Sequence, residues 1–350
     1  MHPAHPILYY AVRERLDITV TKSEILHGRF PESYAGMRLD QALARLFSDY
    51  SRSRLTQWLK SGQISVDGDL LRARDKIRGG EVVEIQAQLE EQTEWQPEAL
   101  PLDIRYEDEH LIIVDKPAGM VVHPAAGNPG GTLVNALLHY EPELASLPRA
   151  GIVHRIDKDT SGLLAVARSL KAQKSLVEQL QAHSLIREYL AIVNGVMTAG
   201  GTVDAPVGRH PVQRKRMAVT PGGKQAVTHY RVLDRYRAHT VIRCRLETGR
   251  THQIRVHMAS IHYPLVGDPV YGTRLKLPKG CHPELAEVLR GFHRQALHAE
   301  RLGLVHPASG KTLEWHSPLA ADMVRLQDAL QLDSRVAAEN EKGEGLWEEA

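Results

Sequence analysis

The alternation of apolar and polar positions divides most of the chain into two regions. In residues 37–85, apolar side chains recur every three or four positions in two short stretches, which predicts two helices. Two short apolar runs, 64–66 and 82–85, then predict the strands of a small hairpin, and Asp67-Gly68 after the first run is a turn sequence. We therefore expect a compact module of two short helices and a hairpin.

Residues 102–332 form the larger region, in which apolar runs and helical patterns are interleaved irregularly. The predicted strands are residues 111–114, 163–167, 189–193, 229–233 and 240–246. The last run alternates clearly, with Thr, Ile, Cys and Leu at its even positions and Arg at two of the odd ones. Such alternation is typical of a half-exposed antiparallel or mixed sheet rather than a doubly wound parallel one. We predict an α+β fold in which a mixed, mostly antiparallel sheet is flanked by helices.

Three segments lack the periodicity of either region. Residues 1–36 are interpreted as an N-terminal extension with room for one strand. Residues 86–101 are polar and acidic and contain Pro97 and Pro101, so we expect a linker there. The acidic residues 333–350 are predicted to form a disordered tail. The two regions between these segments are the expected domains.

Composition describes an ordinary globular protein. Of the 350 residues, 42% are hydrophobic and 25% are charged. No apolar run approaches the roughly 18 residues of a membrane span, and the N-terminus lacks the basic and apolar segments of a secretory signal. Cys244 and Cys281 lie in no CxxC pair, which argues against a disulfide framework and a structural zinc site. We therefore expect a cytoplasmic protein with no membrane contact.

The net charge of +2 is small, but the basic residues are concentrated in patches. Basic residues outnumber acidic ones between Arg52 and Arg78, and the stretch 209–216 contains four basic residues and no acidic one. Such patches are typical of surfaces that bind nucleic-acid phosphates, although a single patch can also be a solvated face. The candidate RNA contacts in the small module are Arg52, Arg54, Lys60, Arg72 and Arg74.

The segment HRIDKDTSG, residues 154–162, combines chemistry with a structural signal. It places Asp157 close to Arg155, and the apolar run that follows predicts a buried strand. A neighbouring guanidinium favours the charged form of a carboxyl group, so we expect Asp157 to be ionised. An ionised Asp can act as a nucleophile or as a general base. Taken alone, such a segment is more often a surface loop with an ion pair.

Four further segments accompany this one along the chain. They are KPAGMVVHP (116–124), REYLA (187–191), GRTHQIRVH (249–257) and GDPVYG (267–272). Together with HRIDKDTSG they resemble the RluA-type family of RNA pseudouridine synthases, and the string RLDQALARLF…SRSRLTQWLKSGQISVDG resembles the S4 RNA-binding domain. The resemblance covers residues 22–330, with Ile156 where the family usually has Leu. It implies an S4 module followed by a pseudouridine synthase catalytic domain.

The resemblance also implies roles for single residues. Asp157 matches the catalytic Asp, Arg255 an Arg that pairs with it, and Tyr189 a Tyr placed against the target base. The candidates for holding the RNA and a flipped-out nucleotide are Arg155, Arg250 and Lys116. In isolation, a Tyr on a strand is more often a core aromatic, and an Arg on a helix is more often a surface cation. Because the isomerisation needs no redox step, group donor or metal, we expect no cofactor and no metal site.

The implied activity is site-specific isomerisation of uridine to pseudouridine in 23S ribosomal RNA, free or in a precursor of the large subunit. We expect a monomer that needs no small-molecule cosubstrate. The alternatives are modification of other ribosomal or transfer RNA uridines, and a catalytically silent S4 protein that only binds ribosomal RNA. A methyltransferase or nuclease is disfavoured because the chain has no glycine-rich cofactor loop and no clustered carboxylates for metals. The pattern leaves open which uridines are modified and whether Asp157 acts as a nucleophile or removes a proton.

Overall fold

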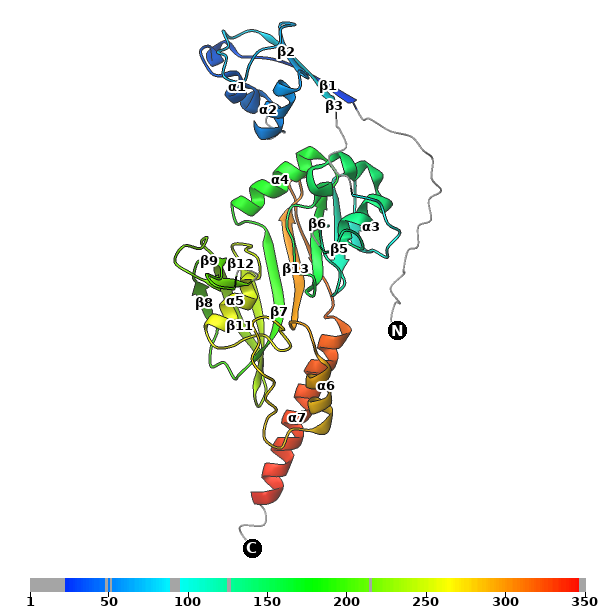
Figure 1. Cartoon of the computed structure of the whole chain (residues 1–350), viewed down its shortest axis with the longest axis vertical. Helices are drawn as coiled ribbons and strands as arrows, with labels where there is room; N and C mark the ends of the chain where they lie inside the picture. The colour runs from blue at the N-terminus through cyan, green and yellow to red at the C-terminus, as the bar shows by residue number, and fades with distance from the viewer. Residues whose placement is uncertain are drawn as a thin grey trace.

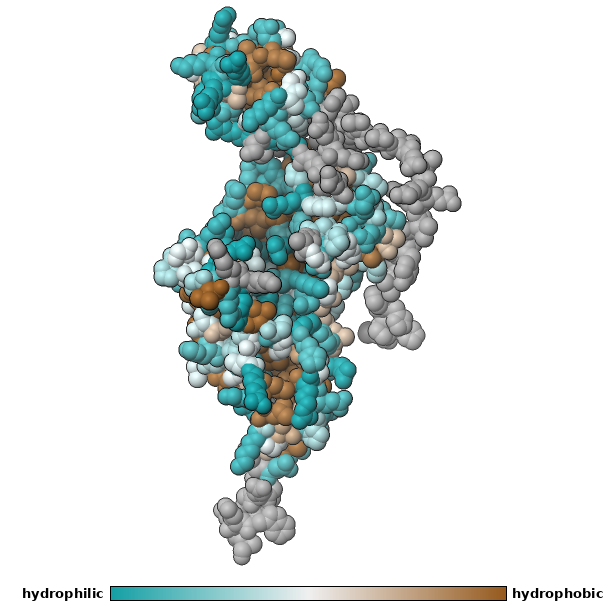
Figure 2. Space-filling view, viewed as in Figure 1, coloured by the Kyte–Doolittle hydropathy of each residue, from teal (hydrophilic) through white to brown (hydrophobic). Residues whose placement is uncertain are grey.

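The computed structural model describes residues 23–47, 50, 52–88, 95–124, 127–213 and 216–345. These residues form a small N-terminal unit and a large unit built around a long sheet (Figure 1). Figure 2 shows that hydrophilic residues cover most of the visible face, broken by small apolar patches. Within the described residues, no helix is long and apolar enough to cross a membrane.

The small unit consists of two helices packed on a three-stranded antiparallel sheet. Helices α1 (Leu39–Leu46) and α2 (Arg52–Lys60) share a core with a sheet in the order β1 (Ser23–Arg29), β3 (Val82–Gln88), β2 (Ile64–Val66). This core includes the buried side chains of Leu39, Leu43, Leu55, Trp58, Ile64 and Ile85. The two helices and the hairpin strands that the apolar pattern predicts are therefore present.

The small unit extends further toward the N-terminus than the sequence indicates. β1 lies inside the predicted extension, yet it pairs with β3 over its whole length, from Ser23 opposite Gln88 to Arg29 opposite Val82. Phe30 follows β1 and is buried in the same core. β1 is an edge strand that leaves apolar surface exposed, so its alternation is weak and gives little signal. The rest of the predicted extension, up to residue 22, lies outside the described residues.

The large unit is built on a nine-stranded sheet. Its strands are β4 (Asp103–Glu107), β5 (Leu111–Lys116), β6 (Ser161–Ala167), β7 (Ile186–Asn194), β8 (Gly201–Asp204), β11 (Val227–Arg235), β12 (His239–Leu246), β13 (Leu297–Val305) and β14 (Thr312–His316). The order is β4-β5-β6-β13-β7-β12-β11-β8, and β14 also pairs with β13. Neighbouring strands are antiparallel except β6 and β13, which are parallel. The predicted mixed, mostly antiparallel sheet is confirmed.

Helices cover both faces of this sheet. α3 (Leu133–Tyr140) and α5 (Gln253–Ser260) pack on the face that carries Tyr189. The helices on the other face are α4 (Leu170–Gln181), α6 (Pro283–Gly291) and α7 (Ala321–Gly345). The smaller elements are β9 (Val207–Arg209), β10 (Met217–Val219) and the 3₁₀ helices η1 (Glu32–Tyr34), η2 (Pro142–Ser146) and η3 (Pro148–Gly151). Covered on both sides, β6 is buried at every residue, which explains its continuous apolar run.

The second half of the predicted linker is packed on the large unit. Residues 89–94 lie outside the described part of the chain, but Trp95 packs against the core of the large sheet. The Glu98 carboxylate accepts a hydrogen bond from the backbone N–H of Gly131, and Asn135, which caps α3, donates to a carbonyl of this segment at 2.7 Å. The segment therefore belongs to the large unit, although its irregular backbone produces no periodic pattern.

The prediction of a disordered tail from residue 333 is wrong for most of that tail. α7 continues to Gly345, and only residues 346–350 lie outside the described part of the chain. The first turns of α7 are anchored by Met323, Leu326 and Leu330, which pack with α6. A helix nucleated by packing can continue through residues of high helix propensity, such as the Ala and Glu of the tail. Acidic composition alone therefore gave the wrong prediction.

Candidate active site

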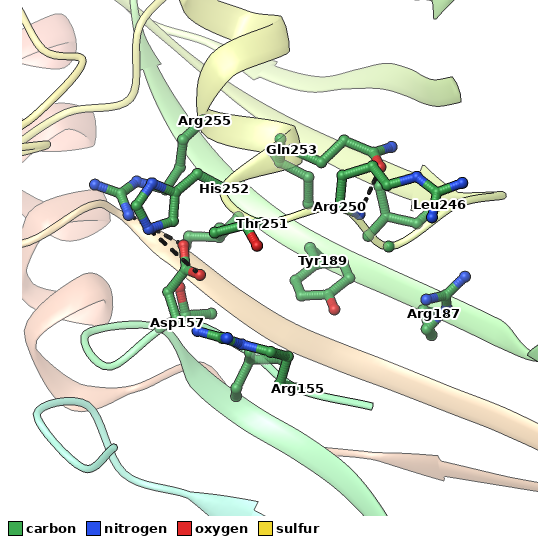
Figure 3. Close-up of a pocket in the computed structure, with 15 residues that line it drawn as sticks. Arg155, Asp157, Arg187, Tyr189, Leu246, Arg250, Thr251, His252, Gln253 and Arg255 are labelled. Carbon is green, nitrogen blue, oxygen red and sulfur yellow. Dashed lines mark hydrogen bonds and ion pairs between the residues drawn. The ribbon is translucent and has the colours of Figure 1, made fainter. Parts of the chain in front are cut away.

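A pocket lies beside α5, and three segments that are distant in the sequence line it. They are the loop before β6, strand β7, and the loop that leads from β12 into α5. β6 and β7 lie on either side of β13 in the sheet, so the loop before β6 comes close to β7. Figure 3 shows Asp157 and Arg255 at one end of the pocket, Arg187 at the other, and Tyr189 between them. Asp157, Tyr189 and Arg255, the predicted catalytic residues, thus line one cavity.

Arg255 connects two carboxylates. Its Nη1 donates to Asp157 Oδ2 at 3.0 Å, and its Nε and Nη2 donate to the two carboxylate oxygens of Asp268 at 2.7 and 2.9 Å. The side chains of Arg255 and Asp268 are 5% and 0% exposed, whereas that of Asp157 is 16% exposed. The two-point contact with Asp268 fixes the plane of the guanidinium. The remaining donor then orients the Asp157 carboxylate in the pocket.

The charges of this trio stabilise one another. Burial alone would lower the pKa of Arg255, but the hydrogen bonds and charges of Asp268 and Asp157 raise it above its ordinary value. Burial acts to raise the pKa of Asp268, yet the Arg255 guanidinium holds it below its usual range. Arg255 and Asp268 are therefore a fully ionised buried pair at neutral pH. Their arrangement leaves one positively charged donor for Asp157.

The segment GDPVYG contributes Asp268 and Tyr271 to this arrangement. The Asp268 carboxylate accepts hydrogen bonds from the backbone N–H groups of Val270 and Tyr271 at 2.8 and 3.0 Å, which closes a tight turn. The turn places the Tyr271 ring against Arg255, whose guanidinium carbon is 5.0 Å from the ring centroid. This segment therefore holds Arg255 from two sides.

His252 lies next to Asp157 in a strained backbone conformation. It precedes α5 with a φ of 56°, in the left-handed region that non-glycine residues rarely adopt. Its Nδ1 is 2.8 Å from the Tyr271 hydroxyl, which also accepts a hydrogen bond from the Met217 N–H. Its Nε2 is 3.9 Å from Asp157 Oδ1. Burial lowers the pKa of His252, which favours the neutral imidazole.

Tyr189 and Arg187 project from β7 into the pocket, because alternate residues of a strand share a face. Each is 6% exposed. Burial raises the pKa of Tyr189 to about 12, so the residue is a neutral phenol at neutral pH. Tyr189 gives the pocket a flat aromatic surface with a hydroxyl at its edge, a suitable platform for a planar base.

Arg155 and Arg250 bring positive charge to the entrance of the pocket. Both line the pocket and both are exposed. The Arg250 Nε donates to the Gln225 carbonyl at 3.0 Å, which directs the side chain along the loop before α5. The structure thus brings these two predicted RNA-binding arginines to the same cavity as Asp157.

Lys116 does not line the pocket, so the prediction that it contacts RNA is corrected. Its side chain is 0% exposed, and Nζ donates to the carbonyls of Pro117, Met120 and Lys158 at 2.7, 2.8 and 2.9 Å. Burial lowers the pKa of Lys116 to about 7. With all three donors used, the residue ties the loop after β5 to the loop that carries Asp157. Its role is to support the site from inside.

Comparison with known proteins identifies the family of the chain. Residues 110–260 match the family described as RNA pseudouridylate synthase, and residues 37–83 match the S4 domain. The chain is 58% identical to ribosomal large subunit pseudouridine synthase D of Xanthomonas campestris over 309 residues, which cover 88% of this chain and 93% of that protein. The chain belongs to the RNA pseudouridine synthase family. This synthase is therefore an isomerase, with an S4 domain before its catalytic domain, as the motifs predict.

Further relatives agree with this assignment. The synthase is 54% identical to ribosomal large subunit pseudouridine synthase D of Escherichia coli strain K12 over 321 residues, which cover 91% of this chain and 96% of the relative. Among solved structures, human RNA Pseudouridylate Synthase Domain Containing 4 is similar with a TM-score of 0.53 and 25% identity. That match covers 65% of this chain and 93% of the human one. The predicted fold class and family are confirmed.

The S4 domain of the synthase exposes most of its predicted RNA-binding residues. The exposed ones are Arg52, Lys60, Arg72 and Arg74. Arg52 and Lys60 line a shallow hollow on α2, where positions eight residues apart share a helix face. Arg52 also pairs with Asp40 at 2.6 Å, so part of its charge is compensated within the domain. These four residues remain available for phosphate contacts.

Arg54 differs from these four residues, and the prediction that it contacts RNA is corrected. It is 8% exposed, and its guanidinium carbon lies 5.9 Å from the centroid of the Trp58 ring in the core of the S4 domain. In the second basic stretch, Arg214 and Lys215 lie outside the described residues. Arg216 packs over Tyr271, with its guanidinium carbon 5.3 Å from the ring centroid. Basic residue type alone does not distinguish these packed arginines from exposed ones.

Three contributors to the pocket region were not singled out by their sequence. Arg187, His252 and Asp268 all lie inside the quoted motifs but carried no assigned role. For Arg187 a signal exists, because it lies two residues before Tyr189 on a strand and must share its face. Asp268 and His252 gave no comparable signal, since their contacts with Arg255 and Asp157 cross long sequence separations.

The synthase has no evident metal centre in the part of the chain that the structure describes. Among those residues, no group of three or more His, Cys, Asp and Glu side chains is arranged to hold a metal ion. Cys244 and Cys281 are both free thiols, and burial raises the pKa of Cys244 to about 12. The expectation that no cofactor is needed stays a prediction, based on the chemistry of the isomerisation.

Proposed function

We propose that this synthase isomerises specific uridines to pseudouridine in 23S ribosomal RNA during maturation of the large subunit, with Asp157 as the essential carboxylate. The observation that carries the proposal is the position of Asp157 at the pocket, held by a guanidinium that Asp268 orients from behind. The names of the relatives, ribosomal large subunit pseudouridine synthase D, support the choice of RNA.

Asp157 supplies the carboxylate with which the reaction can begin. The reaction breaks the N1–C1′ bond of uridine, turns the uracil, and joins C5 to C1′. An ionised carboxylate can start this sequence by attacking the sugar or base, or by removing a sugar proton. Arg255 orients the Asp157 carboxylate through Oδ2 and does not contact its second oxygen, Oδ1. Both roles for Asp157 remain compatible with this arrangement.

Tyr189 and the entrance arginines account for substrate binding. The uracil can stack on the Tyr189 ring, and the hydroxyl can take part in the late loss of the C5 proton. The target nucleotide has to leave its base stack to reach Asp157, because the reacting atoms are hidden inside folded RNA. Arg155 and Arg250 at the entrance suit the phosphates on either side of an extruded nucleotide.

The proposal also covers the S4 domain, the need for cofactors, the oligomeric state and the compartment. The exposed basic residues of the S4 domain supply a second contact with the RNA. The reaction rearranges a single nucleotide, so we propose that it proceeds without cofactor or cosubstrate. We also propose that the synthase is a monomer and acts in the cytoplasm, where it would reach a precursor of the ribosome.

The test is site mapping on unmodified 23S ribosomal RNA. The RNA is incubated with the purified protein, and pseudouridine is detected by carbodiimide adducts that stop primer extension. We expect new stops with the wild-type protein and none with Asp157→Asn. Asp159→Asn is the matched control, because Asp159 lies in the same loop but does not line the pocket.

The outcomes separate the alternatives. Stops on transfer RNA but not on 23S ribosomal RNA would overturn the proposed substrate. RNA binding without stops on either RNA would favour a silent binding protein. Equal activity of Asp157→Asn and Asp159→Asn would overturn the role of Asp157. We expect Asp157→Asn to keep nearly wild-type RNA affinity, because its carboxylate reacts rather than docks the RNA.

A further inference from the structure

Arg187 is a buried cation with no anionic partner in the described part of the chain. Its side chain is 6% exposed, and no Asp or Glu of the described chain lies within ion-pair distance of it. Its Nη2 donates to the Glu247 carbonyl at 3.0 Å, while Nε is buried and has no hydrogen-bond partner among the described residues. Arg255, at the other end of the pocket, is bound by two carboxylates. The two arginines therefore meet opposite electrostatic conditions.

The surrounding chain leaves room for this cation. Gly249, at the start of the loop into α5, faces the Arg187 guanidinium, and a Cβ at this position would come within 2.7 Å of Nη1. Gly249 and Arg187 both line the pocket. Figure 3 shows Arg187 on the side of Tyr189 away from Asp157. A base stacked on Tyr189 would thus have the carboxylate at one edge and the guanidinium at the other.

An unpaired buried charge lowers the stability of the protein without its ligand. Its presence indicates that Arg187 binds a ligand group. Removing a guanidinium from water costs several kcal/mol unless hydrogen bonds and an opposite charge compensate for it. Burial lowers the pKa of Arg187, but a guanidinium stays protonated in proteins. The missing negative charge or acceptor oxygen must therefore come from whatever occupies the pocket.

Two parts of an RNA could supply that oxygen, a backbone phosphate or the uracil. Phosphates suit the exposed entrance, where Arg155 and Arg250 are available to bind them. Arg187 lies deeper, on the same strand face as the aromatic ring of Tyr189. Since an extruded nucleotide enters base first, the depth of Arg187 favours the base.

The chemistry places negative charge on the base at this point. If Asp157 attacks C1′, its oxygen forms the new bond while the N1–C1′ electron pair leaves with the uracil. If Asp157 instead removes the C2′ proton, a C1′–C2′ double bond forms and the same electron pair leaves with N1. If it adds to the base at C6, the displaced electron pair moves onto the ring and its carbonyl oxygen. In every case the uracil becomes anionic before C5 bonds to C1′ and releases its proton.

We propose that Arg187 is a further catalytic residue, which donates hydrogen bonds to a carbonyl oxygen of the target uracil and stabilises the negative charge that the base acquires. The proposal rests on the proposed pseudouridine synthase function but not on which RNA is modified. Because Arg187 is fixed before the substrate arrives, it acts like an oxyanion hole.

The test compares Arg187→Gln with wild type in single-turnover reactions at saturating enzyme, together with RNA affinity at several salt concentrations. The RNA used is one that the wild-type protein modifies. If the wild-type protein modifies no RNA, the result contradicts the proposed function and not the role of Arg187. Arg245→Gln is the matched control. Arg245 is exposed, lies opposite Glu188 in the register of β12 and β7, and does not line the pocket.

We expect Arg187→Gln to lower the single-turnover rate constant about 100- to 1,000-fold. Affinity and its salt dependence should stay close to those of wild type, and Arg187→Lys should recover part of the rate because it retains a cation. The melting temperature of the free Arg187→Gln protein should not fall, since the substitution removes an uncompensated buried charge. Arg245→Gln should match wild type in every measurement.

Two results would overturn the proposal. A weaker affinity with a salt slope reduced by about 0.7, at an unchanged rate constant, would show that Arg187 binds a phosphate instead. A lower melting temperature with an unchanged rate constant would show that Arg187 only supports the fold.

Discussion

The buried pair between Asp268 and Arg255 makes a sharp prediction for Asp268→Asn. In the wild-type protein, Asp268 Oδ2 accepts from Arg255 Nε at 2.7 Å, and Oδ1 accepts from Arg255 Nη2 and from two backbone N–H groups. An Asn that keeps Oδ1 in place turns its amide nitrogen toward Nε, donor against donor. The substitution also leaves the 5% exposed Arg255 with one carboxylate instead of two.

The expected loss of stability is large. Removing one partner of a buried ion pair costs about 3 to 5 kcal/mol, because the other charge loses its compensation. For a catalytic domain of this size, such a loss lowers the melting temperature by roughly 6 to 20 °C. The reaction should slow as well, because Arg255 no longer holds one plane and Asp157 loses its fixed direction. A carboxylate misplaced by about 1 Å slows the reaction on the order of 100-fold.

The assay combines thermal unfolding with single-turnover pseudouridine formation at a temperature where every variant is folded. Asp333→Asn is the matched control, because Asp333 is also buried and pairs with an arginine, Arg237, at 3.2 Å, but does not line the pocket. We expect the control to lose stability and to keep its rate per folded molecule. The reasoning is refuted if Asp268→Asn melts like wild type, or if both variants react at the wild-type rate.

Two further predictions concern pH and salt. The half-buried ring of His154 accepts a hydrogen bond from a backbone N–H at 3.1 Å, and desolvation of the ring lowers its pKa to about 3. The unfolded chain binds a proton on this ring near pH 6.5, so the contribution of His154 to the free energy of unfolding should be complete above that pH and should be lost as the pH falls toward about 3. In chemical denaturation at several pH values, His154→Gln should show a smaller loss of stability at low pH than wild type. The control His293→Gln, at an exposed position, should show the same loss as wild type. In the S4 domain, replacing both Arg52 and Lys60 by Gln should weaken RNA binding and reduce its salt slope by about 1.4 or more, measured by fluorescence anisotropy from low to moderate salt. An unchanged salt slope would contradict an RNA contact by this face of α2.

Local patterns predicted part of the architecture. The helices of the S4 domain and five strands of the catalytic sheet, β5, β6, β7, β11 and β12, follow from apolar periodicity, which depends only on which face of an element is buried. The strands β4, β8, β13 and β14 of the same sheet were not predicted. The apolar pattern also did not predict the edge strand β1 or the packed segment after residue 94. Their order comes from pairing with β3 and from hydrogen bonds to α3, and neither leaves a period in the sequence.

Single residues show the same limit at the site. Lys116 and Arg54 have the residue type of RNA contacts, but one is buried against three carbonyls and the other lies in the S4 core beside Trp58. A long basic side chain can serve either purpose, because its charge is compatible with solvent, with phosphate or with a satisfied interior position. Only its neighbours decide between these uses.

The sequence by itself determined the motifs and the family they belong to, and it predicted Asp157, Tyr189 and Arg255 as catalytic residues. It did so because reactive groups and their flanking turns are local, and local order survives in a linear string. The tertiary structure alone decided that Asp268 fixes Arg255, that His252 approaches Asp157, and that Arg187 is buried with no anionic partner among the residues that the structure describes. These are relations between side chains that the sheet brings together across long sequence separations, and they depend on burial and distance, which no single segment encodes.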